Sequence, residues 1–188
     1  MTGQVMAGDR GKFGVVRILL WGAVVVLLAL PAIAMQFTDE VNWTASDFVF
    51  AAFMFGGTGL LLELTVRSSP NWSYRGGVAA ALAAAFLLIW VNGAVGIIGD
   101  EDNPLNGIYL AEIMIALVGA LFARFRAQGM ALAMAAAGIA QAAIGCYALI
   151  AGWGANEPPG AFGVLMINGF FAALWLLSAG LFRNAARK

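Results

Sequence analysis

The chain has 188 residues, of which 62% are hydrophobic and only 11% are charged. Soluble globular domains carry about 25% charged residues, so this composition excludes an ordinary water-soluble fold and indicates an integral membrane protein. The formal net charge is zero. We expect this chain to interact with the lipid bilayer and not with nucleic acid.

Several residue types that cofactors require are absent or misplaced. The chain has no histidine, which excludes a histidine-ligated haem and removes the commonest general base at neutral pH. Lysine occurs only at Lys12 and Lys188, so a retinal Schiff base inside a membrane helix is also excluded. The single cysteine, Cys146, cannot form an intrachain disulfide. We therefore expect no bound cofactor and no enzyme active site.

Six apolar runs follow one another along the chain. Each approaches or exceeds the length of about 20 residues that a membrane helix needs. Because the connecting segments are too short to hold a second domain, we expect one transmembrane domain over residues 1–188. The predicted spans are approximately 14–37, 48–66, 77–98, 107–122, 129–152 and 161–182.

The first run has two interpretations. Ala32 to Ala34 fits a small-residue cleavage site after a basic segment, so residues 1–34 have the pattern of a secretory signal peptide. The alternative is a retained helix, which Pro31 would kink near its outer end. We favour the retained helix, because the apolar run continues to Phe37 and is long for a signal peptide.

Charged residues separate according to the predicted loop that they occupy. If the spans alternate in direction, all ten Lys and Arg residues fall on one side, and an excess of these residues marks the cytoplasm. We therefore predict an all-α polytopic protein of three consecutive helical hairpins in the bacterial inner membrane, with both termini cytoplasmic. The inner cations are Arg10, Lys12, Arg17, Arg67, Arg75, Arg124, Arg126, Arg183, Arg187 and Lys188, and the outer acids are Asp39, Glu40, Asp47, Asp100, Glu101, Asp102 and Glu157.

The loop at residues 99–106 concentrates hard oxygen ligands. Asp100 and Asp102 are weak candidates for a metal site, and Ca²⁺ is the ion that carboxylate clusters of this kind bind. The spacing, however, lacks the full EF-hand pattern. We favour a solvated acidic turn that sets the orientation of the chain, with no firm metal ligand.

The predicted topology does not explain why two polar residues near that loop lie inside apolar spans. Asn92 and Glu112 each lie ten residues from Asp102, so a hairpin centred there would place them at similar depth. A carboxylate inside the membrane needs a partner or water, because its burial costs about 2–3 kcal/mol at the helix centre. One interpretation is that Glu112 extends to the outer interface and Asn92 joins two helices. The other is a polar pocket in which Glu112 titrates or binds an ion, formed by Asn92, Glu112, Gln141 and Asn168.

Glu63 is the other acidic residue inside a predicted span. It precedes Arg67 by four residues on the same helix, a spacing at which opposite charges pair, so we predict a structural ion pair. A proton path from Glu112 to Glu63 would cross about half of the hydrocarbon core with few polar residues between them, and we do not favour it.

Small residues on several predicted helices allow close helix packing. They are frequent in the fifth span and in the second, where Gly56, Gly57 and Gly59 follow one another closely. Faces of this kind on a monomer are available to a second copy or to a different protein, so the sequence allows a homo- or hetero-oligomer.

The segment from Trp90 to Pro104, together with Asp47, Phe48 and Glu63, resembles a group of small bacterial multipass membrane proteins that have no assigned activity. The resemblance covers about the middle half of the chain. It implies a bacterial inner-membrane location and implies no mechanism.

Our preferred hypothesis for the function is a non-catalytic structural or accessory subunit, or a small binding protein. The alternative is a small proton or cation transporter or channel, in which the acidic outer loops concentrate cations and Glu112 is the coupling carboxylate. A membrane enzyme ranks third, because carboxyl and hydroxyl groups are present but not clustered.

Overall fold

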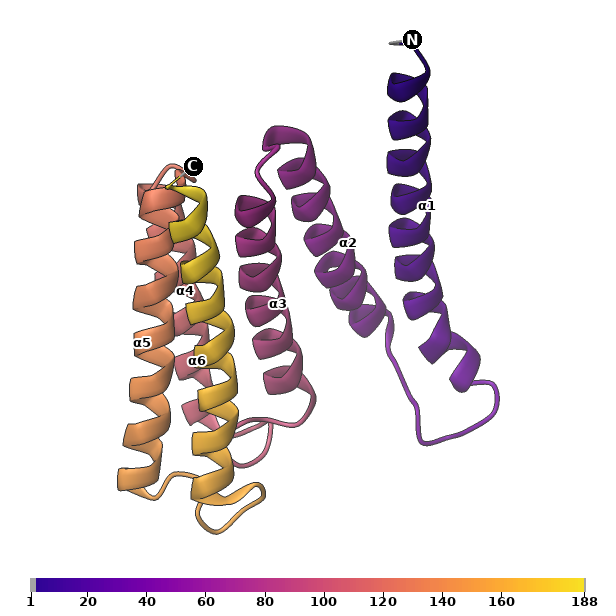
Figure 1. Ribbon diagram of the computed structural model, residues 1–188. Helices are drawn as coiled ribbons and strands as arrows, with labels where there is room; N and C mark the ends of the chain where they lie inside the picture. Colours follow the sequence, from indigo (N-terminus) through magenta and orange to yellow (C-terminus); the bar gives the residue numbers. More distant parts are fainter. Residues whose placement is uncertain (1–2, 188) are drawn as a thin grey trace. The chain divides into compact units, whose positions relative to one another are not determined.

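The computed structural model describes residues 3–187, and over this range the chain contains helices and loops without a β-strand. Six of the helices are long and apolar enough to cross a membrane, which confirms the predicted number of spans. The elements are α1 (Gly3–Ala34), α2 (Ala45–Ser68), α3 (Trp72–Ala94), the short 3₁₀ helix η1 (Pro104–Gly107), α4 (Ile108–Phe122), α5 (Ala127–Ala151) and α6 (Gly160–Ala185). Figure 1 labels the six long helices.

The third helix begins and ends earlier than the predicted span at 77–98. Its start is capped by Asn71, whose side-chain oxygen accepts a hydrogen bond from the backbone N–H of Tyr74 at 3.1 Å. Such a cap satisfies an N–H group that has no partner inside the helix. The helix ends at Ala94 because Gly96 has a φ of +73°, a left-handed conformation that glycine adopts readily. The residues up to 98 therefore belong to a folded loop.

The chain forms two compact units, one ending at Leu64 and the other beginning at Thr65. The first unit contains α1 and most of α2. These two helices meet at Gly59, where an added Cβ atom would lie 3.3 Å from a methyl carbon of Leu20. Within Arg17–Ala34, the part of α1 that is long and apolar enough to cross a membrane, no residue is fully buried. Apolar side chains of α1 such as Ile18, Leu19 and Val25 are exposed, as lipid contact requires.

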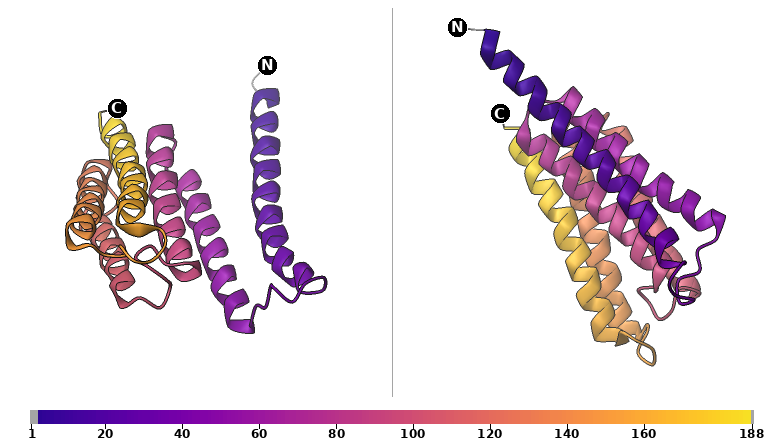
Figure 2. Two further views of the ribbon diagram at one scale, coloured as in Figure 1. Left: turned by 90° about the horizontal axis from the view of Figure 1, so that it is seen from below. Right: turned by 90° about the vertical axis from the view of Figure 1, so that its right-hand side faces the viewer.

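The second unit is a bundle of α3, α4, α5 and α6. Helix α6 packs along both α3 and α5, while α4 packs against α5 (Figures 1 and 2). Helices α3 and α4 are consecutive among the spans but touch each other little. The largest fully buried side chains include Trp175 and Phe182 on α6 and Tyr109 on α4. Helices α5 and α6 therefore form the centre of the bundle, with α3 beside α6 and α4 beside α5.

Hydrogen bonds identify one end of this bundle. The hydroxyl group of Tyr74 donates to the backbone oxygen of Phe125 at 2.7 Å, which joins the start of α3 to the α4–α5 turn. The side-chain amide of Asn184 donates to the hydroxyl oxygen of Ser73 at 3.0 Å, which joins the end of α6 to the start of α3. We call this the basic end, because it carries Arg75, Arg124, Arg126, Arg183 and Arg187.

Candidate functional site

Glu112 lies in the second turn of α4, inside the bundle of the second unit. The residue is only 1% exposed, and neither carboxyl oxygen has a hydrogen-bond partner among the described residues. Glu112 therefore does not extend to the surface, in contrast to one of the two sequence-based interpretations. An ionised carboxylate in such a position is strongly disfavoured unless a proton or a cation neutralises it.

Three buried polar side chains form a series of hydrogen bonds across the bundle. The side-chain nitrogen of Gln141 on α5 donates to the side-chain oxygen of Asn168 on α6 at 2.8 Å. The side-chain nitrogen of Asn168 donates to the hydroxyl oxygen of Tyr109 on α4 at 2.9 Å, and to the backbone oxygen of Val164 at 2.8 Å. Gln141, Asn168 and Tyr109 are all 0% exposed. This group, which we call the polar chain, links three helices.

The donors of the polar chain point in one direction. Gln141 donates to Asn168, and Asn168 donates to Tyr109. The Tyr109 hydroxyl group therefore acts as an acceptor and keeps its own proton for another acceptor. Glu112 follows Tyr109 by three residues on α4, a spacing that places both side chains on the same helix face. A hydroxyl donor and an unpartnered carboxyl group are thus neighbours on one face of α4.

Close approach of α5 and α6 brings the polar chain together. An added Cβ atom on Gly145 would lie 2.6 Å from the Cβ atom of Asn168, which is closer than two carbon atoms pack. Glycine at this position therefore permits the contact between the two helices. Gln141 lies one turn earlier on α5, and the contact places its side chain within hydrogen-bond distance of Asn168.

The buried side-chain oxygens that lack a hydrogen-bond partner all belong to carboxyl or amide groups. Besides the two carboxyl oxygens of Glu112, the side-chain oxygens of Gln141 and Asn92 receive no hydrogen bond from the part of the chain that the structure describes. Leaving a buried acceptor unpaired costs about 1–3 kcal/mol. Amide and carboxylate oxygens are also the ligands that hard cations prefer. The bundle therefore contains acceptor groups that a proton, a water molecule or a small cation would satisfy.

Asn92 makes its hydrogen bond outside the polar chain and away from Glu112. Its side-chain nitrogen donates to the backbone oxygen of Asn106 at 3.5 Å, and it makes no hydrogen bond with Glu112. The prediction assumed a simple hairpin between α3 and α4. The loop after α3 instead folds back onto the bundle, where Ile97 and Ile98 are fully buried. Equal distance along the chain therefore does not bring Asn92 and Glu112 into a pair.

Asn106 organises this loop, a role that no sequence pattern had indicated. Its side-chain oxygen accepts hydrogen bonds from the backbone N–H groups of Ile97 at 3.1 Å and Ile98 at 2.8 Å. Its side-chain nitrogen donates to the backbone oxygen of Asp100 at 2.7 Å. These bonds satisfy backbone groups that have no partner in regular secondary structure. They also hold Ile97 and Ile98 in one apolar cluster with Tyr109.

Asp100 and Asp102, the candidate metal ligands, lie on the exposed surface of the loop. Among the side chains that the structure describes, residues 17–187, no group of three or more His, Cys, Asp or Glu is close enough to share a metal ion. Glu157, from the α5–α6 loop, lies against Gly99 of the α3–α4 loop. The two loops therefore meet, and they carry acidic side chains at the end of the bundle opposite the basic end.

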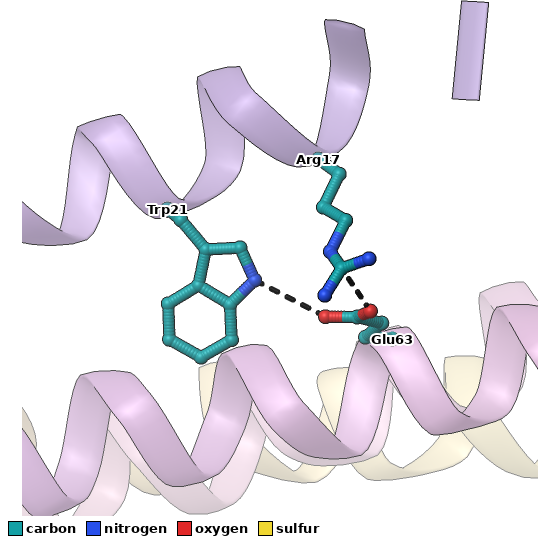
Figure 3. A network of polar contacts seen from close by, with 3 residues as sticks. All are labelled: Arg17, Trp21 and Glu63. Atoms are coloured by element: carbon teal, nitrogen blue, oxygen red, sulfur yellow. Dashed lines mark hydrogen bonds and ion pairs between the residues drawn. The ribbon is translucent and has the colours of Figure 1, made fainter. Parts of the chain in front are cut away.

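A separate polar group joins α1 to α2 in the first unit (Figure 3). The Nε atom of Arg17 lies 3.1 Å from a carboxylate oxygen of Glu63, and the indole N–H of Trp21 donates to the other oxygen at 3.1 Å. The pairing of Glu63 with Arg67 on the same helix stays a prediction from the sequence. Arg17 and Trp21 come from another helix, and no local spacing relates them to Glu63. We assign this group a structural role.

Comparison of the chain with models of known protein families, with curated proteins and with solved structures found no match. The six long apolar helices define the class, a multi-pass α-helical membrane protein. The resemblance of the segment Trp90–Pro104 to small bacterial multipass proteins therefore stays a prediction from the sequence.

Proposed function

We propose that the protein is a small, non-catalytic membrane transport protein in which Glu112 binds a proton or a small cation. The single observation that carries this proposal is the burial of the Glu112 carboxyl group without a hydrogen-bond partner. Acidic side chains inside membrane helices are rare, and they mark ion or proton pathways. A carboxyl group kept at this position without a structural partner is best explained by a ligand that binds it.

The neighbouring polar chain supports the same proposal. Its hydroxyl group at Tyr109 is next to Glu112 on α4, and its amide group at Gln141 retains an oxygen that receives no hydrogen bond from the described residues. A proton would make the carboxyl group neutral, so that it donates as well as accepts. A small cation would leave the carboxylate ionised and would draw further ligands from oxygens of this kind. Either ligand compensates the burial of the acid.

We further propose that the six spans form three hairpins, with both termini in the cytoplasm of a bacterial inner membrane. The distribution of Lys and Arg along the sequence supports this orientation. In this orientation, Asp100, Asp102 and Glu157 lie on the outer surface. Acidic side chains there raise the local concentration of cations at the end of the bundle that contains the acidic loops.

A flux assay tests the transport function. Full-length protein in liposomes is given a proton, Na⁺ or K⁺ gradient, and the internal ion concentration is followed with a fluorescent dye. We expect the wild-type protein to pass protons or one of these cations. Glu112→Gln should lower the rate by about tenfold or more, because an amide side chain neither takes up a proton nor carries the negative charge that would bind a cation inside the membrane.

The matched control is Glu157→Gln, which removes an exposed carboxyl group from a loop and should leave most of the flux. Absence of any flux in the wild-type protein contradicts the proposal. Equal flux through the wild-type protein and Glu112→Gln contradicts it too.

The second candidate is a structural or accessory subunit, which open positions on α2 favour. An added Cβ atom on Gly56 or Gly57 would meet no atom of the first unit within 4 Å, so this face can receive a helix of another protein. We then expect mild-detergent preparations of the wild-type protein to contain a stoichiometric partner protein. Gly57→Leu should abolish binding of this partner. The control Gly169→Leu, at an open position on α6, should retain it. A monomer without a partner contradicts this candidate.

A further inference from the structure

A groove of about 520 Å³ lies between α5 and α6 at the basic end of the bundle. Its volume falls within the range of about 300–1,000 Å³ that small-molecule sites occupy. Small and apolar side chains form most of its walls, while the start of α5 and the last turn of α6 contribute polar groups. The residues that matter here are Ala131, Leu132 and Ala135 on α5 and Leu176, Gly180 and Arg183 on α6.

The groove narrows toward the middle of the bundle. An added Cβ atom on Gly138 would lie 2.9 Å from the Cγ atom of Leu176, so α5 and α6 are in close contact there. Nearer the basic end the helices leave space, and an added Cβ atom on Gly180 would meet no atom within 4 Å. Leu132 and Leu176 in the groove walls are 71% and 48% exposed. The groove is therefore an apolar slot that is open to its surroundings along the helices.

Arg183 gives the slot a positive charge at the basic end of the bundle. It is exposed in the last turn of α6, the region where a spanning helix leaves the hydrocarbon core. In the described part of the chain, no salt bridge or hydrogen bond engages its guanidinium group. The acidic residues of the second unit lie on α4 and in the loops at the opposite end. Within the second unit, no acidic residue is therefore near enough to pair with Arg183.

We propose that this groove binds an anionic phospholipid, with one acyl chain along α5 and α6 and the headgroup phosphate at Arg183. Guanidinium groups bind phosphate through paired, charge-assisted hydrogen bonds. Charge complementarity favours this occupant over a second copy of the chain. A symmetric contact through the same face would bring two Arg183 side chains together, and like charges at an interface are unfavourable.

Native mass spectrometry tests the proposal. The full-length protein in detergent is titrated with phosphatidylglycerol or with phosphatidylcholine that has the same acyl chains. We expect phosphatidylglycerol to bind about fivefold more tightly, because one basic residue near an anionic headgroup contributes about that factor. Arg183→Gln should remove this preference. Arg187→Gln, which removes another exposed cation from the same end but outside the groove, should retain it.

A second pair of variants tests the groove itself. Gly180→Leu fills the slot without displacing a neighbour, because its Cβ atom enters open space, and it should weaken the binding of both lipids. Gly169→Leu also adds a side chain in open space on α6, outside the groove, and should change neither affinity. Thermal unfolding in detergent verifies that each variant is folded.

Four outcomes would overturn the proposal. They are equal affinity for the two lipids, equal loss of preference in Arg183→Gln and Arg187→Gln, unchanged lipid binding in Gly180→Leu, and equal weakening in Gly180→Leu and Gly169→Leu. A dimer that Gly180→Leu dissociates while lipid affinity stays constant would assign the groove to a second copy of the chain.

Discussion

The side-chain nitrogen of Gln141 donates a hydrogen bond of 2.8 Å to Asn168, and this bond ties α5 to α6 inside the membrane-spanning bundle. Both residues are fully buried. In an apolar environment, an amide group that loses its partner has no water to replace it. The pair therefore constrains the register of the two helices and, through Asn168, the position of Tyr109.

Asn168→Leu should destabilise the protein. The substitution keeps the approximate size of the side chain but leaves Gln141 and Tyr109 without the partner that they have now. We expect a loss of about 1–3 kcal/mol, measured by denaturant unfolding in detergent. The control is Asn184→Leu, whose hydrogen bond to Ser73 is exposed and should contribute within about 0.5 kcal/mol. Equal losses in the two variants would argue against a structural role for the polar chain.

Gly145→Ala should also destabilise the protein, because its methyl group would lie 2.6 Å from the Cβ atom of Asn168. Overpacking of this kind costs about 1–3 kcal/mol. Gly169→Ala adds the same methyl group to α6 in open space, and it should keep or raise the stability because alanine favours helix. Unfolding curves that coincide for the two variants would mean that α5 and α6 are not in close contact at Gly145.

Glu112→Leu should raise stability while it abolishes transport. It replaces a buried carboxyl group that has no hydrogen-bond partner within the described residues with an apolar side chain, and we expect a gain of about 1 kcal/mol or more. Glu112→Gln retains a buried polar group and should not show this gain. Unfolding and flux are measured on the same preparations. A functional residue is often kept at the expense of stability, which is why we expect the gain. A leucine variant that is less stable than the wild-type protein would instead indicate that Glu112 has a structural role.

Arg17 and Glu63 should show a small coupling energy. Their side chains are 60% and 17% exposed, so we expect about 0.2–1 kcal/mol from a double-mutant cycle of Arg17→Gln and Glu63→Gln. The cycle separates this pair from the hydrogen bond that Trp21 donates to Glu63. Additive effects of the two substitutions on unfolding would show that the ion pair contributes nothing.

Asn106→Ala should loosen the α3–α4 loop. It removes the acceptor for the backbone N–H groups of Ile97 and Ile98 and the donor to Asp100. We expect faster amide hydrogen exchange at Ile97 and Ile98, because these groups then open locally. Asn103→Ala is the control, since the side chain of Asn103 accepts a hydrogen bond only at the start of η1. Unchanged exchange in Asn106→Ala would mean that packing alone holds the loop.

Composition and hydropathy by themselves determined that this is a membrane protein with six candidate spans. The reason is that each apolar segment is long enough for lipid on its own, whichever neighbour it has. The position of Glu112 within a span followed from the same local pattern. The bounds of α3 were less accurate, because they depend on the cap at Asn71 and the backbone conformation of Gly96.

Only the tertiary structure decided which polar residues meet. Gln141 and Asn168 had been named as candidates, but their bond and its extension to Tyr109 depend on the close contact at Gly145. Asn92 had the clearer argument from spacing, yet it contacts the α3–α4 loop. Hydropathy determines that a helix lies in lipid, whereas the packing of small residues against distant helices determines which of its faces are buried. That packing brings together residues that are far apart in the chain, and the local periodicity of a single sequence carries no information about such contacts.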